Sequence, residues 1–120
     1  MELPQLNNLQ LYYQKLEFIQ ATADQLIKDF RLVDEEITFS GKAETAYQEL
    51  LDQVVPIIDR LINLDTERFF NLLYTVDLNE AKVKQLLFQD QAEPTAVAVS
   101  KYIIERELTK VLIRKHFSTQ

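Results

Sequence analysis

His116 is the only histidine in the chain, so it is the first side chain to consider as a general base or a metal ligand. It lies within the last five residues, where helix ends fray. A di-iron carboxylate bundle needs a Glu-x-x-His pair on two helices. This chain has no second histidine, and the residue three before His116 is Ile113. We therefore expect a solvated histidine and no catalytic residue.

The densest carboxylate cluster is Asp34-Glu35-Glu36. Hard cations bind carboxylate oxygens, but this cluster lacks the alternating spacing and the glycine of a calcium loop. Asp77 and Asn79 have part of that spacing, and helix capping explains them better. The chain has no cysteine and a single glycine, which excludes cysteine-ligated zinc, disulfides and glycine-rich phosphate loops. We expect no metal and no cofactor.

Four aromatic side chains lie near one another in two expected helices. Such a group can line a cavity for a small ligand. Aromatic residues at helical spacing also fill ordinary cores, so both interpretations stay open. The four residues are Phe69, Phe70, Tyr74 and Phe88.

Basic side chains at positions 106, 110 and 114 form a stripe with a spacing of four on the last expected helix, and they are Arg106, Lys110 and Arg114. The stripe is either solvated, paired with acids of a neighbouring helix, or available to an acidic partner. Residues 1–100 carry 8 basic and 17 acidic side chains, whereas residues 101–120 carry 5 basic and 2 acidic ones. Because the net charge is −6, we expect no binding to nucleic acid.

Apolar residues recur at alternating spacings of three and four along most of the chain, which is typical of helices with a buried seam. The pattern predicts helices over about 5–33, 41–64, 66–76, 80–89 and 94–117. Ser40, Asp65 and Asn79 are the expected N-caps of the second, third and fourth helices. The second helix has two adjacent apolar seams, so we expect it to be central, with Pro56 inside it.

These elements predict an all-α, up-and-down-like bundle of three long and two short helices, with residues 1–120 forming one domain. No apolar run approaches the roughly 20 residues that span a bilayer. The N-terminus lacks the basic and apolar regions of a signal peptide. We therefore expect a cytoplasmic protein that has no membrane partner.

A second apolar stripe lies off the main seam. Leu11 and Phe18 are one heptad apart on the first helix, and Ile103, Ile113 and Phe117 lie off the main seam of the last helix. The stripe is either a set of scattered surface residues or a partner surface. A symmetric homodimer would bury it, with the basic stripe at the rim of the interface.

The stretches 65–79 and 103–117 resemble segments of small, uncharacterised all-α bacterial proteins. The resemblance covers about a quarter of the chain. It implies a helical bacterial protein, and it carries over neither an activity nor any site residue.

Taken together, the sequence favours a non-catalytic protein-interaction or assembly module. The alternative is a small-ligand-binding bundle that uses the four aromatic residues. A DNA-binding regulator is disfavoured by the acidic charge.

Overall fold

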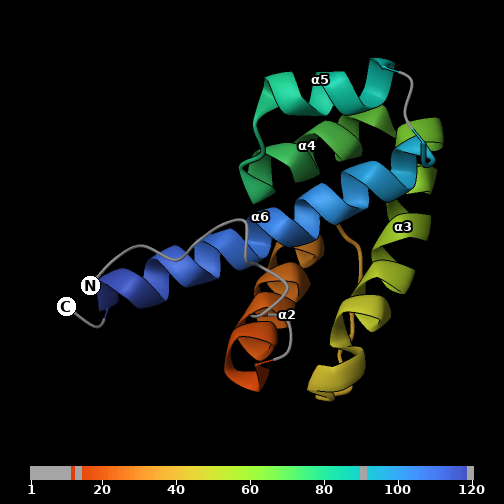
Figure 1. Ribbon diagram of the computed structural model, residues 1–120. Helices are drawn as coiled ribbons and strands as arrows, with labels where there is room; N and C mark the ends of the chain where they lie inside the picture. The colour runs from red at the N-terminus through yellow and green to blue at the C-terminus, as the bar shows by residue number, and fades with distance from the viewer. Residues whose placement is uncertain (1–11, 13–14, 90–91, 119–120) are drawn as a thin grey trace.

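The computed structural model describes residues 12, 15–89 and 92–118 (Figure 1). Over these residues the protein is 80% helical and has no strand. The helices are α2 (Leu16–Arg31), α3 (Ala46–Leu64), α4 (Thr66–Val76), α5 (Glu80–Phe88) and α6 (Thr95–Ser118), with a short 3-10 turn, η2 (Ala43–Thr45), before α3. The predicted all-α fold, with three longer and two shorter helices, is confirmed for this part of the chain.

Helix α2 begins later than the apolar pattern predicts. Lys15 has extended backbone angles, φ −100° and ψ 116°, and the helix starts at Leu16. The predicted helix over 5–33 is therefore not continuous through Lys15, and positions 5–11 lie outside the described residues. At its other end the chain turns sharply, since Asp34 is left-handed with φ 61° and the Glu35 N–H donates to the Phe30 carbonyl at 2.9 Å.

Helix α3 starts after η2, and Ser40 does not cap it, contrary to the prediction. The Ser40 N–H and hydroxyl both bond the carboxylate of Glu49, each at 2.7 Å. This carboxylate reaches back along the chain and ties the preceding loop to the first turn of α3. Helix α3 then continues past Pro56 without a break, as expected from the unchanged phase of its apolar residues.

The caps of α4 and α5 are confirmed. The Asp65 carboxylate accepts from the Arg68 N–H at 3.2 Å, and the Asn79 amide oxygen accepts from the Lys82 N–H at 3.0 Å. Between the two helices Asp77 is left-handed with φ 65°, and its N–H donates to the Leu73 carbonyl at 3.0 Å. Local side-chain chemistry therefore fixes where both short helices begin.

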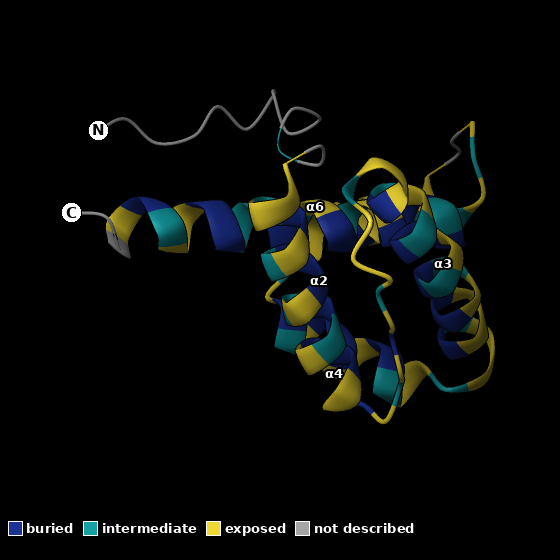
Figure 2. Ribbon diagram, turned by 90° about the horizontal axis from the view of Figure 1, so that it is seen from below, coloured by how far each residue is buried: buried dark blue, intermediate teal, exposed yellow. Residues whose placement is uncertain are grey.

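Helix α6 is the central element, and not α3 as predicted. It crosses the molecule in Figure 1 with α2 and α3 on one side and the α4–α5 pair on the other, and it packs against all four. In Figure 2 much of α6 is coloured as buried. The fully buried large side chains of α6 are Ile103, Ile104, Glu107, Leu108 and Leu112. A helix that is apolar on most sides is buried on most sides.

Candidate functional site

A groove of about 720 Å³ lies between α4 and α5, and it carries the two most exposed aromatic residues of the described structure, Tyr74 and Phe88. Tyr74 is 90% exposed, Phe88 is 82% exposed and Phe70 is 56% exposed. Leu73, Val83 and Leu87 form more of its apolar lining. We call this surface the α4–α5 face, made of Phe70, Leu73, Tyr74, Val83, Leu87 and Phe88, with Asp77, Glu80 and Lys84 at its polar positions.

The helical geometry of α4 explains why two aromatic residues face the solvent. Phe70 and Tyr74 are four residues apart, so they share one side of the helix. Phe69 lies about 100° around the helix from Phe70, on the side that packs into the core, and it is only 2% exposed. The predicted group of four aromatics therefore divides into one core residue and three groove residues.

Phe69, although buried, still packs against Phe70. Its ring centroid lies 5.7 Å from that of Phe70. Both rings, with Phe88, line a neighbouring hollow of about 450 Å³ beside the start of α6. The aromatic residues thus line two adjoining surface hollows, which is a different arrangement from the single cavity that the sequence interpretation considered.

The predicted basic stripe of α6 is occupied within the molecule. Arg106 donates to the Asp77 carboxylate and to the Asp77 carbonyl, both at 3.0 Å. Arg114 donates to the Gln25 amide oxygen at 3.3 Å. Lys110 lies between two acids at the α2–α6 interface, described below. Of the three alternatives for this stripe, the structure shows pairing with neighbouring helices and loops.

The predicted apolar dimer stripe is covered only in part. Ile103 is fully buried, because α6 is central and buries a second side against its neighbours. Phe18 is half-buried, with Tyr12 packed edge-on at 5.2 Å and the Lys115 ammonium 5.8 Å from its ring. Leu11 lies outside the described residues. Ile113 at 36% and Phe117 at 59% remain exposed near the C-terminal end of α6.

His116 is not the solvated side chain that its position near the terminus predicted. It is 8% exposed, and its ring packs edge-on against Phe117 with centroids 5.1 Å apart. Helix α6 continues to Ser118, so His116 lies within the helix and not in a frayed end.

Comparison with protein-family models, curated proteins and solved structures finds no match to this chain. The function is therefore inferred from the arrangement of the chain's own residues. Of the described helices, none combines the length and apolarity that crossing a bilayer requires.

A buried acid pair at the α2–α6 interface was not anticipated from the sequence. Glu107 is fully buried and Asp29 is 3% exposed. The Lys110 ammonium lies 2.6 Å from Glu107 Oε1 and 3.2 Å from Asp29 Oδ2. Gln25 donates to the second oxygen of Asp29 at 3.0 Å. One cation thus faces two buried carboxyl groups.

Burial, and after it the neighbouring carboxyl group of Asp29, raise the pKa of Glu107 from its ordinary value of 4.5 to about 8, and the Lys110 ammonium opposes part of this rise. Glu107 therefore carries a proton at neutral pH, and Asp29 pairs with Lys110. The sequence did contain a signal, since Glu107 interrupts the apolar positions Ile104, Leu108 and Val111 on one side of α6.

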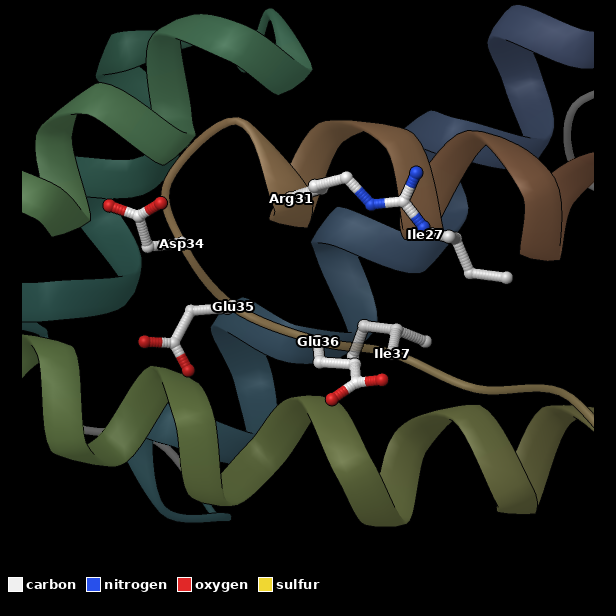
Figure 3. A pocket seen from close by; sticks show the side chains of 6 residues that line it. All are labelled: Ile27, Arg31, Asp34, Glu35, Glu36 and Ile37. Atoms are coloured by element: carbon white, nitrogen blue, oxygen red, sulfur yellow. The ribbon is translucent and has the colours of Figure 1, made fainter.

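The acidic cluster at 34–36 lines a pocket of about 270 Å³ beside Arg31 (Figure 3). Its carboxylates point in different directions, and Arg31 extends along α2 towards Ile27. Glu35 binds two arginines: Arg60 donates at 2.6 and 3.2 Å, and Arg68 also donates to it. Among the described residues no group of three or more potential ligands could hold a metal ion.

Arg68 gives the Glu35 cluster a structural role, because it also donates twice to the Val33 carbonyl, at 2.7 and 3.1 Å. The loop after α2 is thereby tied to both α3 and α4. We expect Glu35→Gln to lower the free energy of unfolding by about 1–3 kcal/mol, since it removes the charge that both arginines bind. Urea denaturation with an unchanged m-value measures this loss.

Glu36→Gln is the matched control, because Glu36 is exposed and adjacent in the chain. We expect a change within about 0.5 kcal/mol for this variant. Equal losses for the two variants would contradict the assigned role of Glu35.

Proposed function

We propose that this protein is a non-catalytic protein-interaction module whose docking surface is the α4–α5 face. The observation that carries the proposal is the exposure of Phe70, Tyr74 and Phe88, at 56%, 90% and 82%, along one groove. Exposed apolar patches with a polar rim are typical of interaction sites. Aromatic residues are also enriched at the centres of protein interfaces.

The free energy available from burying these three side chains favours weak association. Fully burying one large apolar side chain contributes about 1.5–3 kcal/mol, so three contribute on the order of 5 kcal/mol. Association itself costs about 4–15 kcal/mol in lost freedom of motion. These three side chains alone therefore barely offset the cost of association, so binding also needs contacts from the rest of the α4–α5 face and is expected to be weak and reversible.

A small-molecule ligand is the second candidate. The groove volume of about 720 Å³ falls within the roughly 300–1,000 Å³ that is typical of ligand sites. Asp77, Glu80 and Lys84 would supply the polar contacts, although Asp77 already binds Arg106. Protein docking is favoured over this alternative because Tyr74 and Phe88 are almost fully exposed, whereas ligand sites bury most of the ligand between their walls.

Site-specific photo-crosslinking tests the proposal. A benzophenone amino acid replaces Tyr74, and a control chain carries it at Gln48, which is exposed in the first turn of α3. That end of α3 lies far from α4 and α5 in Figure 1. After irradiation in cells that make the protein, we expect protein adducts from position 74 that position 48 does not give. Equal adduct yields at the two positions would refute the proposal.

A further inference from the structure

The charges on the α4–α5 face balance one another. Asp77 is neutralised by Arg106 at 3.0 Å, which leaves Glu80 and Lys84 as the other charged side chains that line the groove. Both are exposed on α5, and they are four residues apart, so they lie one turn from each other on the same side of the helix. The face therefore carries one acid and one base in a fixed order along α5.

This balance contrasts with the chain as a whole, whose net charge is −6. Two copies that meet through most of their surface bring like charges together. At the α4–α5 face they meet through a surface with no net charge. A strongly basic or strongly acidic partner, by comparison, would be expected to face a rim of the opposite sign.

When two copies of α5 lie antiparallel, the acid of each copy lies opposite the base of the other. A two-fold axis produces that arrangement, because it places identical surfaces against each other with the helices antiparallel. Glu80 of one copy then faces Lys84 of the partner subunit, and the reverse contact occurs on the other side of the axis. Phe88 lies one turn beyond Lys84 on α5, and Phe70 and Tyr74 lie on α4, so the aromatic side chains flank these ion pairs.

We propose that the occupant of the α4–α5 face is a second copy of this chain, with the two α4–α5 pairs packed as an antiparallel four-helix bundle. This inference rests on the proposed function. The grooved shape is compatible with a dimer. Tyr74 and Phe88 line the groove and are mostly exposed, so side chains of the opposite copy can fill the groove and contact both residues.

The size of the face predicts a weak dimer. Helix α4 has 11 residues and is therefore about 16 Å long, and two helices side by side are about 20 Å wide. A face of that size is smaller than the roughly 800 Å² per partner of a standard stable interface. Dimerisation is therefore expected at tens to hundreds of micromolar, so the test must cover that range.

Sedimentation equilibrium between about 10 and 500 µM tests the inference through charge reversal. Glu80→Lys and Lys84→Glu each place like charges opposite each other twice across the axis, and each is expected to weaken dimerisation roughly ten-fold. The double variant restores opposite charges and is expected to recover most of the affinity. Recovery of dimer affinity in the double variant is the decisive result. If each change weakened dimerisation only by disturbing the structure, the double variant would be weaker than either single variant.

Lys42→Glu and Glu44→Lys are the matched controls, since they change the charge by the same amounts at exposed positions outside the face. Tyr74→Ser removes the most exposed aromatic side chain and is expected to give a monomer with an unchanged helical circular dichroism spectrum. Equal effects of the control changes, or a dimer that Tyr74→Ser does not weaken, would overturn the inference.

A mass of 14.1 kDa at every concentration would also overturn it. The proposed function would then stand or fall separately, on whether position 74 crosslinks to a different protein. Failure of the inference and failure of the proposed function thus give different results.

Discussion

Raising the pH from 5 to 8 is expected to destabilise this protein through Glu107, with the folding equilibrium constant falling by up to about ten-fold per pH unit. Its pKa rises from 4.5 to about 8 on folding, because the side chain is fully buried beside Asp29. Between these two values the unfolded chain has lost the proton that the folded protein keeps. The stabilisation is therefore complete below about pH 4.5 and is lost as the pH rises through about 8.

Glu107→Gln is expected to flatten this part of the pH profile. A glutamine amide has the shape of the protonated acid, and it can donate to Asp29 while its oxygen accepts from Lys110. We therefore expect the variant to match the unmodified protein near pH 5 and to exceed its stability above pH 8. Urea denaturation at five or six pH values, with both chains in the same buffers, measures the difference.

Glu105→Gln is the control for the removal of one carboxylate, since Glu105 is exposed on the same helix. Its profile should run parallel to that of the unmodified protein. A Glu107→Gln profile as steep as the control would show that Glu107 is already ionised at neutral pH in the folded state. Contributions from distant titrating groups cancel in these comparisons, whereas Asp29 and Lys110 contact Glu107 and belong to the effect that is measured.

The parts of this fold that were predicted correctly depend on neighbours in the chain. Asp65 and Asn79 cap helices through hydrogen bonds to N–H groups three residues further on, so their own sequence context is sufficient. The bounds of α4 follow from the same local information. Ser40 has equally good capping chemistry, but Glu49 in the first turn of α3 competes for its hydrogen bonds.

The central helix was predicted incorrectly and the surroundings of the basic stripe were left open, because both depend on how the helices pack against one another. The apolar residues of α3 and α6 both occupy wide faces, and the pattern alone does not rank them. The charged residues of α6 add to the difficulty, because a stripe such as Arg106 and Lys110 reads as a surface until its partners, Asp77 and Asp29, are known. Those partners lie 29 and 81 residues away in the sequence.

The candidate site was partly readable from the sequence. The spacing of four between Phe70 and Tyr74 places them on one side of α4, and the adjacent position of Phe69 places it on another. The exposure of Phe70 and Tyr74 required the tertiary structure, because the same spacing is typical of a core seam. The spacing of four between Glu80 and Lys84 became informative only once the groove between α4 and α5 was located.

Leu61→Ala is expected to lower the free energy of unfolding by about 2–5 kcal/mol. Leu61 is fully buried in the core of the fold, so its truncation removes apolar contacts and leaves a cavity that the surrounding helices fill only in part. Leu64→Ala is the matched control, because Leu64 is on the same helix and is 80% exposed. We expect this control to change stability by no more than about 0.5 kcal/mol.

Chemical denaturation of both variants measures the two losses, and the m-value checks that each unfolds in one cooperative step. A loss below about 0.5 kcal/mol for Leu61→Ala would mean that α3 does not pack its Leu61 side against the core. A similar loss for both leucines would mean that the end of α3 is covered in solution. The first result would contradict the burial of Leu61, and the second would contradict the exposure of Leu64.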